Sequence, residues 1–328
     1  QVWVKDESAR LGLPAFKILG ASWAIYRALE TRLGRPFAPW ATLDELRAQL
    51  APLGPLTLAA ATDGNHGRAV ARMARLLGYG AHILVPEGMA EARIAAIVGE
   101  GARVTVVEGT YDDAVALSAR EADARCLVIS DTSWPGYEEV PGWVIDGYAT
   151  IPSAVDAELA RRGEPGPHLL VVQMGVGAFA AAVIGHYRRG GASAPRVVGV
   201  EPADAACVLA SLRAGALTEV PGPHRSIMAG LNCGLPSLIA WPTLVDGLAV
   251  ALAVPDDDAR EAMRDLARAG VVAGETGAAG LAGLAALLTA PGAADLRAHL
   301  GVGPRTRALV FSTEGATDPV AYRQIVGG

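Results

Sequence analysis

Short apolar runs alternate with amphipathic stretches along most of this chain. Apolar runs that end at Gly, Pro or a polar turn are typical of strands buried on both faces of a sheet. They occur at residues 56–62, 80–86, 102–109, 124–130, 168–175, 196–202 and 307–315. Stretches with apolar residues three and four apart predict helices at 67–78, 90–101 and 111–123. The alternation predicts an α/β protein in which helices wrap parallel sheets.

Composition narrows the class of protein. The 328 residues are too many for one small core and suit two lobes or one large α/β domain. A net charge of −6, with no run of Lys or Arg, argues against nucleic acid or an anionic membrane as a partner. No apolar run reaches the roughly 20 residues that a bilayer-spanning helix needs. We therefore expect a soluble enzyme.

The cysteines and histidines give no metal motif. Three cysteines and six scattered histidines show no metal-ligand spacing, so no metal site is expected. So few cysteines indicate a reducing compartment, and the strand-like segment at the start of the sequence does not have the pattern of a signal peptide, so none is expected there. The expected location is the cytoplasm.

Lysine is almost absent from the sequence. Lys5 and Lys17 are the two lysines among 28 basic residues, so arginine carries nearly all of the positive charge. Arginine stays protonated, whereas a buried lysine can lose its proton and attack a carbonyl carbon. Lys17 lies in the apolar segment LPAFKILGA. It is either a catalytic amine or a side chain that keeps its stem on apolar neighbours and its ammonium in water.

A loop rich in polar residues and glycine follows the first of these predicted strands. It carries Thr62, Asp63, Asn65 and His66 in the segment ATDGNHG and opens the first predicted helix. Loops at the carboxyl ends of parallel strands are where α/β proteins bind ligands. The backbone N–H groups at a helix N terminus suit a carboxylate, although Asp63 or Asn65 could equally cap the helix.

A glycine-rich loop follows the run at 168–175. Its segment GVGAFA fits the pattern GxGxxA, and Glu201 ends the next predicted strand. That combination is the fingerprint of a nicotinamide-nucleotide site, with the acid on the ribose. The same loop also suits a single phosphate group, because backbone amides and the helix dipole bind the oxygens. The run at 307–315 ends in a third loop, which offers the hydroxyl of Ser312 or Thr313 or is simply a capped turn.

One cofactor uses all of these groups at once. Pyridoxal phosphate needs a lysine for its aldehyde, amides for its phosphate, a partner for its ring nitrogen and donors for the substrate carboxylate. The sequence offers a candidate for each.

The motifs resemble those of fold-type II pyridoxal phosphate enzymes and, among these, of the diaminopropionate ammonia-lyase family. The resemblance runs nearly end to end and rests on the segments VKDESARLGLPAFKILGAS, AATDGNHGRAVA, SDTSWPGYEEVPGWVIDGYATI, GVGAFAAAV, VGVEPADAAC, SIMAGLNCGLPS, GETGAAG and STEGATDP. It implies two lobes, each an open and mostly parallel sheet wrapped by helices. The large lobe would be residues 1–57 with 152–328, and the small lobe 58–151. The implied protein is a homodimer that acts on a small amino acid.

The resemblance implies a role for each candidate residue. Lys17 is implied to bind the cofactor aldehyde, Asn65 the pyridoxal 3′ oxygen, and Ser312 the ring nitrogen. A neutral hydroxyl leaves that nitrogen unprotonated, which favours β-elimination. The implied phosphate-binding residues are Gly175, Val176, Gly177, Ala178 and Phe179. The implied substrate-binding residues are Thr62, Asp63, Gly64, His66 and Asp131.

Asp63 departs from the related dehydratases, which have a Ser/Gly-type loop at this place. An added carboxylate has a use if the substrate carries a second ammonium group. The resemblance implies that Lys17 takes the Cα proton of an L substrate, Asp63 takes that of a D substrate, and Asp131 orients the substrate. The predicted reaction converts 2,3-diaminopropionate to pyruvate and ammonia. A serine or threonine dehydratase, a nicotinamide-dependent dehydrogenase and a cofactor-free binding protein remain as alternatives.

Four residues outside these loops are interpreted through the same resemblance. Cys207 and Cys233 become near neighbours, either as a disulfide or as two buried thiols, and thiols suit a cytoplasmic protein better. Lys5 is expected to pair with nearby acids. Glu201 becomes a strand-end residue instead of a ribose ligand.

Overall fold

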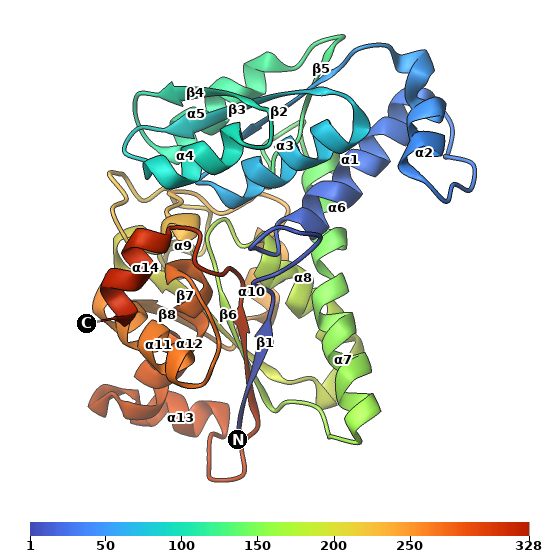
Figure 1. Ribbon diagram of the computed structural model, residues 1–328. Coiled ribbons are helices and arrows are strands. Elements are labelled where there is room, and N and C mark those ends of the chain that lie inside the picture. Colours follow the sequence, from blue (N-terminus) through green and yellow to red (C-terminus); the bar gives the residue numbers. More distant parts are fainter. Residues whose placement is uncertain (328) are drawn as a thin grey trace. The chain divides into compact units, whose positions relative to one another are not determined.

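The chain forms two compact units in the computed structural model, which describes residues 1–327 apart from the side chains of Ala192 and Ser193. The large unit comprises residues 1–16 with 148–327, and the small unit comprises residues 17–147 (Figure 1). Each unit is a parallel sheet with helices packed on it. The α/β fold predicted from the alternating pattern is therefore confirmed.

The division between the units differs from the expected one at one end. The chain re-enters the large unit at Tyr148, close to the expected boundary at 151. Residues 17–57, however, belong to the small unit instead of the large one. The reason is packing, because helix α1 (Ile18–Leu33) lies against helix α3 (Asn65–Leu77) of the small unit.

The large unit is built on one sheet. Its strands are β1 (Val2–Asp6), β6 (Leu169–Gln173), β7 (Arg196–Pro202), β8 (Val250–Val254) and β9 (Ala308–Ser312). Its helices are α7 (Thr150–Arg162), α8 (Ala178–Tyr187), α9 (Cys207–Ala214), α10 (Trp241–Gly247), α11 (Asp256–Arg268), α12 (Glu275–Thr289), α13 (Ala294–Leu300) and α14 (Pro319–Val326). Short 3₁₀ turns are η3 (Arg188–Ser193), η4 (Ala203–Ala205), η5 (Ala229–Leu231) and η6 (Pro291–Ala293).

The strand order of the large unit creates a ligand-binding position. The parallel sheet runs β1-β9-β6-β7-β8, so the chain moves outward from β6 to β8 and then returns across β6 to β9. Since parallel crossovers are right-handed, this reversal sends the later helices to the other face of the sheet. Figure 1 shows α11 and α12 on one side of β6, with α7 and α8 on the other. Ligands bind where the strand order reverses, which here is between the carboxyl ends of β6 and β9.

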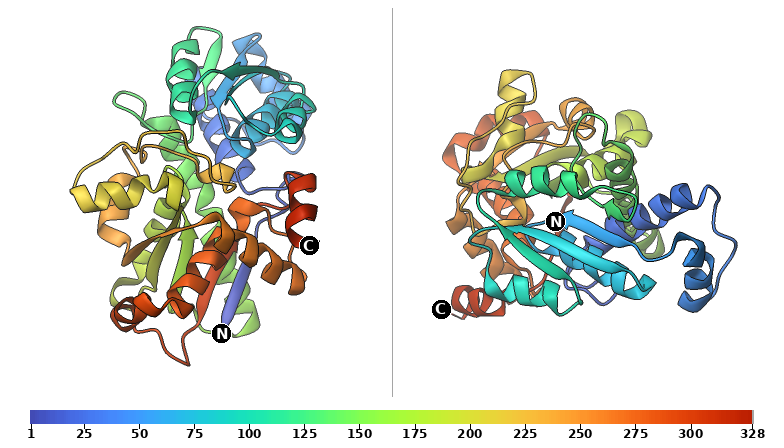
Figure 2. Two further views of the ribbon diagram at one scale, coloured as in Figure 1. Left: turned by 90° about the vertical axis from the view of Figure 1, so that its left-hand side faces the viewer. Right: turned by 90° about the horizontal axis from the view of Figure 1, so that it is seen from above.

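Helix α12 lies unusually close to this sheet. A Cβ added at Gly283 would lie 2.2 Å from the Val200 side chain, and one at Gly277 would lie 2.5 Å from the Glu314 carbonyl oxygen. Glycines on one face therefore let the helix and sheet backbones approach. The orange helices α11 and α12 stand in front of the strands in the left panel of Figure 2.

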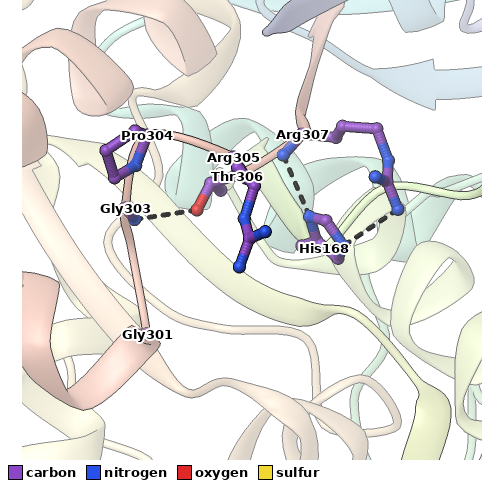
Figure 3. Close-up of a pocket in the computed structure, with 7 residues that line it drawn as sticks. All are labelled: His168, Gly301, Gly303, Pro304, Arg305, Thr306 and Arg307. Atoms are coloured by element: carbon purple, nitrogen blue, oxygen red, sulfur yellow. Dashed lines mark hydrogen bonds between the residues drawn. The ribbon is translucent and has the colours of Figure 1, made fainter.

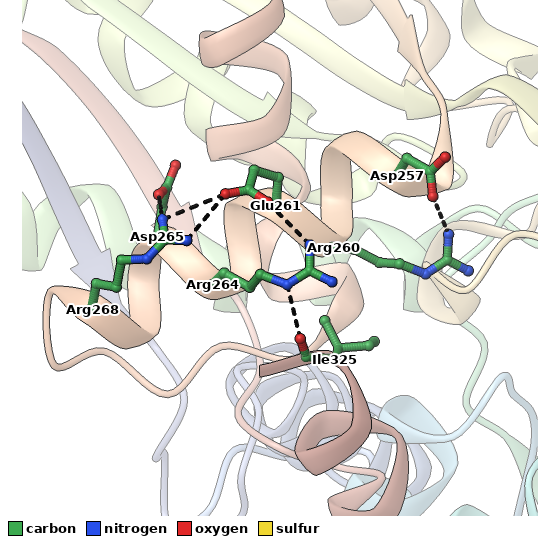
Figure 4. A network of polar contacts seen from close by, with 7 residues as sticks. All are labelled: Asp257, Arg260, Glu261, Arg264, Asp265, Arg268 and Ile325. Atoms are coloured by element: carbon green, nitrogen blue, oxygen red, sulfur yellow. Dashed lines mark hydrogen bonds and ion pairs between the residues drawn. The ribbon is translucent and has the colours of Figure 1, made fainter. Parts of the chain in front are cut away.

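Helix α11 has a polar outer face and an apolar inner face. Arg264 donates to Glu261 at 3.0 Å and, through Nε, to the Ile325 carbonyl oxygen at 2.9 Å, so it joins α11 to α14 (Figure 4). Exposed ion pairs of this kind contribute little to stability, because water and salt screen their charges. Burial of Met263 and Leu266 on the inner face is therefore the stronger contribution to the position of this helix.

The small unit repeats the layout on a smaller scale. Its strands are β2 (Thr57–Ala61), β3 (Gly80–Pro86), β4 (Arg103–Val107) and β5 (Cys126–Val128). Its further helices are α2 (Leu43–Leu50), α4 (Glu91–Val98), α5 (Tyr111–Ser118) and α6 (Glu139–Tyr148), with 3₁₀ turns η1 (Ala51–Leu53) and η2 (Ala119–Glu121). The parallel sheet runs β4-β3-β2-β5, so the chain moves from β2 to β4 and then returns across β2 to β5. The order reverses between β2 and β5, and the loops after these strands meet at that point.

The strands and helices predicted from the sequence agree with those of the structure. Each predicted strand corresponds to one of β2 to β7 or β9, and the predicted helices correspond to α3, α4 and α5. Strand β8 was not predicted, because its sequence VALAV is rich in alanine and the strand is only partly buried. Within the residues described, no single helix is long and apolar enough to span a membrane, although the bent pair Glu275–Thr289 and Pro291–Leu300 meets the criteria of length and composition together.

Candidate active site

Lys17 and Asp131 form an ion pair in the small unit. Lys17 is the N-cap residue of α1, and Asp131 follows β5 at the point where the strand order reverses. Lys17 Nζ donates a hydrogen bond to Asp131 Oδ2. The Lys17 side chain is 21% exposed, whereas the Asp131 side chain is buried. The lysine singled out by composition therefore faces a buried carboxylate.

Asp131 is held in its ionised form. Burial alone would raise the pKa of its carboxyl group, but the positive charge of Lys17 and hydrogen bonds from Lys17 and Tyr111 keep that pKa well below its usual range. The Tyr111 hydroxyl donates to Asp131 Oδ1 at 3.1 Å, so both carboxylate oxygens have a donor.

His66 lies beside this pair as a neutral ring. Burial lowers its pKa, and its Nε2 is 2.7 Å from the Ile129 carbonyl oxygen, so we assign the ring proton to Nε2. Its Nδ1 lies 3.9 Å from Asp131 Oδ2, which is too long for a hydrogen bond. Nδ1 is buried without a hydrogen-bond partner among the described residues and can accept one from a ligand.

The loop after β2 adds a second carboxyl group, whose pKa is shifted in the opposite direction from that of Asp131. Asp63 is half-buried, and burial together with the negative charge of Asp131 raises its pKa well above the usual carboxyl range. The charges of Lys17 and Arg93 oppose this shift. Two carboxylates whose pKa values are pushed apart are typical of an acid–base site.

Thr62 shapes this loop from within. It is buried, and its hydroxyl oxygen accepts hydrogen bonds from the N–H groups of Gly64 and Gly67, both at 2.9 Å. Gly64 has a φ of +138°, which lies outside the range of most side chains. Asn65 begins α3 and is half-buried. Thr62 therefore positions the loop, and the small unit brings all of its predicted site residues to one end of its sheet.

In the large unit, the glycine loop and Ser312 lie at the corresponding reversal. Gly177 has a φ of +91° at the N-cap of α8, and a Cβ there would lie 2.5 Å from Leu244. The first N–H groups of a helix have no partner within it, so they are free to bind an anion. Val171 pairs with Val310, which brings the ends of β6 and β9 to the same level.

The end of β9 presents a buried hydroxyl group. Ser312 is 1% exposed, and its Oγ has no hydrogen bond among the described residues. A buried polar atom of this kind indicates a ligand that completes its hydrogen bonding. An amide-lined loop beside a buried, neutral hydroxyl fits the phosphate and ring nitrogen of pyridoxal phosphate.

The side chain of Phe179 is buried in an aromatic cluster. Its ring packs against Phe16 and Phe311, with centroids 4.8 and 5.3 Å away, and a looser contact to Tyr148 at 6.2 Å. Only its backbone is available to a phosphate. The cluster also fixes Phe16, which directly precedes Lys17 in the chain.

The remaining residues singled out from the sequence have structural contacts. Lys5 pairs with Glu7 at 3.3 Å, as expected. Cys207 and Cys233 are buried thiols. Glu201 is fully buried and accepts the N–H groups of Val208 and Leu209 at 2.7 and 2.8 Å, while burial raises its pKa to about 7.

The contacts of Glu201 argue against a nicotinamide-nucleotide site. The Glu201 carboxylate caps helix α9 and is occupied by backbone donors, so it is not free to bind a ribose. The glycine loop is therefore better matched to a single phosphate group.

A surface cavity of about 630 Å³ lies elsewhere in the large unit (Figure 3). Its lining includes His168 and Arg307, which directly precede β6 and β9. The Arg307 backbone N–H donates to His168 Nδ1 at 3.1 Å. This is the amino end of the sheet, whereas α/β proteins bind their ligands at the carboxyl end.

Sequence reasoning missed Tyr111. Its segment TYDD carries the signal of a helix start, with Thr110 as the cap. Nothing in the sequence indicates that the tyrosine hydroxyl reaches Asp131, because that contact depends on how α5 lies on the sheet.

Comparison with known proteins places the chain in a family. A model of the family described as pyridoxal-phosphate dependent enzymes matches residues 1–296. Diaminopropionate ammonia-lyase of Salmonella typhimurium is 36% identical over 340 residues, which cover 99% of this chain and 83% of that protein.

Two crystal structures of diaminopropionate ammonia lyase from Escherichia coli are also similar, each at 34% identity over 99% of this chain. The structure in complex with D-serine has a TM-score of 0.90 and is covered over 83% of its length. The structure in complex with an aminoacrylate-PLP azomethine reaction intermediate has a TM-score of 0.87 and is covered over 82%. At this identity and coverage, the chain belongs to the pyridoxal-phosphate dependent enzymes and, within them, to the diaminopropionate ammonia-lyase family.

Proposed function

We propose that this enzyme converts 2,3-diaminopropionate and water to pyruvate and two molecules of ammonia. The observation that carries the proposal is the pair of carboxylates near one lysine. Asp131 is ionised and bound to Lys17, whereas Asp63 has a raised pKa. A substrate with two amino groups gives a use to both carboxylates, since one can orient an ammonium group while the other moves a proton.

Pyridoxal phosphate, when bound, withdraws electrons from the substrate Cα, so that the Cα proton and then the β-amino group can leave. We assign the aldehyde of the cofactor to Lys17 Nζ. Once the substrate amine has displaced it, Lys17 Nζ takes the Cα proton of the L isomer. Asp131, whose Oδ2 is the hydrogen-bond acceptor of Nζ, orients this amine.

Asp63 is assigned to the D isomer, whose Cα proton lies on the other side. A carboxyl group with a raised pKa is a stronger base once ionised than an ordinary carboxylate, which suits proton removal from carbon. His66 lies at the same end of the sheet, where its Nδ1 can accept a hydrogen bond from a substrate ammonium group.

The large-unit residues are assigned to holding the cofactor. The N–H groups of the glycine loop and the start of α8, from Gly175 to Phe179, bind the phosphate, and the Ser312 hydroxyl bonds the ring nitrogen. Both assignments rest on a helix N terminus with no side-chain cap, on the positive φ of Gly177, and on the Ser312 Oγ, which has no hydrogen-bond partner among the described residues. Asn65 is assigned to the 3′ oxygen of the ring.

Substrate competition tests this function. We expect D- and L-2,3-diaminopropionate to release pyruvate at least about tenfold faster than L-serine, and L-threonine to give little 2-oxobutyrate, because only diaminopropionate engages both carboxylates. Each pyruvate should be accompanied by two ammonia molecules. Faster turnover of the hydroxy amino acids would make the enzyme a serine or threonine dehydratase instead.

We further propose a cytoplasmic homodimer. The presence of only three cysteines, all thiols, supports a reducing compartment, and the family resemblance supports the dimer. Light scattering of the purified protein measures the subunit number directly.

A further inference from the structure

The Asp131 carboxylate accepts hydrogen bonds from two side chains, Lys17 and Tyr111. The mechanism proposed above uses Lys17 but not Tyr111. Oδ2 accepts the hydrogen bond from Lys17, and Oδ1 accepts the one from Tyr111 at 3.1 Å. Tyr111 is 5% exposed, so its hydroxyl group lies away from bulk water. A hydrogen bond to a buried, charged acceptor is among the stronger ones in proteins.

The position of Tyr111 is fixed by the way α5 begins. Thr110 Oγ1 accepts the Asp113 N–H at 3.3 Å, and Asp113 Oδ2 accepts the Thr110 N–H at 2.7 Å, which completes a capping box. Tyr111 is the first residue of the helix that this box holds, and α5 packs on β2 and β3. The capped start of α5 therefore fixes the place from which the Tyr111 hydroxyl reaches Asp131.

The Asp131 carboxylate needs such a support. Rotation about the terminal bond of an aspartate side chain is broad, so one hydrogen bond leaves the plane of the carboxylate loosely defined. Two donors on different oxygens define that plane. We propose that Tyr111 is a positioning residue, whose hydroxyl group fixes the Asp131 carboxylate so that Oδ2 faces Lys17 Nζ.

This inference rests on the role proposed for Lys17, but the first readout of its test does not depend on the substrate. The variant is Tyr111→Phe, which keeps the ring and removes only the hydroxyl group. Tyr79→Phe is the matched control, because the Tyr79 hydroxyl is also buried but has no hydrogen-bond partner among the described residues. The first readout is the rate at which apoprotein mixed with pyridoxal phosphate gains its visible absorption band. The second is the kcat and KM for both diaminopropionate isomers.

We expect Tyr111→Phe to slow band formation and to lower kcat, each by roughly 10- to 100-fold, the usual effect of one hydrogen bond to a charged group. KM should change by less than about threefold, since the Asp131 carboxylate keeps its charge and loses only one of the two hydrogen bonds that orient it. Tyr79→Phe should match the wild type in both readouts. The melting temperature of each variant separates these effects from unfolding.

A double-mutant cycle shows whether Tyr111 acts through Asp131. In an Asp131→Asn background, Tyr111→Phe should change the rate of band formation by less than about twofold. Wild-type rates in Tyr111→Phe, an equal loss in Tyr79→Phe, or an undiminished loss in the Asp131→Asn background would each overturn the proposal. If the wild-type protein fails to turn over diaminopropionate, band formation still reports on Tyr111, so the two failures are distinguishable.

Discussion

Replacement of Lys17 by Arg is expected to abolish the visible absorption band of the bound cofactor and to lower turnover by roughly a thousandfold or more. Arginine preserves the positive charge beside Asp131, so the ion pair can persist. A guanidinium group cannot lose its proton to attack an aldehyde, however, and cannot remove a proton from carbon. Absorption spectroscopy and pyruvate release measure the two effects.

Lys5→Arg is the matched control for this substitution. Lys5 is the only other lysine of the chain, and its contact is an ion pair with Glu7 that arginine can also form. The band and the activity should therefore survive in Lys5→Arg. A yellow, active Lys17→Arg protein would show that Lys17 is not the amine that binds the cofactor.

Replacement of Asp63 by Asn should separate the two substrate isomers. The cofactor band should remain, turnover of the D isomer should fall by roughly 10²- to 10⁴-fold, and turnover of the L isomer should fall by less than about tenfold. The difference arises because the amide has no base function, while Lys17 still serves the L isomer. Steady-state kinetics with each isomer measures the ratio, and the L isomer is the internal control.

The pH dependence of the wild type adds a second check on Asp63. Burial and the charge of Asp131 raise its pKa, and only the ionised form is a base. Turnover of the D isomer should therefore decrease as the pH falls through this raised pKa, at a higher pH than for an ordinary carboxylate. Equal losses for both isomers in Asp63→Asn would instead indicate that Asp63 binds substrate.

The fold was predictable where the pattern of the chain was unambiguous. Strands such as β6 and β9 are buried along their whole length, so their apolar runs are continuous and end in glycine or polar turns. Strand β8 was missed because it is only partly buried and rich in alanine. Residues 17–57 were assigned to the wrong unit, because the packing of α1 on α3 is a tertiary contact that leaves no local signal.

The candidate site was predictable to a similar extent. Lys17 stood out by composition, and the loops with Asp63 and Gly177 stood out by their position after strands. Their roles remain predictions. The contacts that set the charge and orientation of these side chains could not be predicted from the sequence, since the ion pair between Lys17 and Asp131 joins residues 114 positions apart. The hydroxyl of Tyr111 reaches the same carboxylate from a third segment.

The most direct test of the central claim is to locate the cofactor on the chain. The protein loaded with pyridoxal phosphate would be reduced with borohydride and digested, and its peptides would be analysed by mass spectrometry. With only two lysines, the label has two possible side-chain positions. We predict that the reduced cofactor is found on the peptide containing Lys17 and is absent from the one containing Lys5. A label on Lys5, or no label on either lysine, would contradict this account.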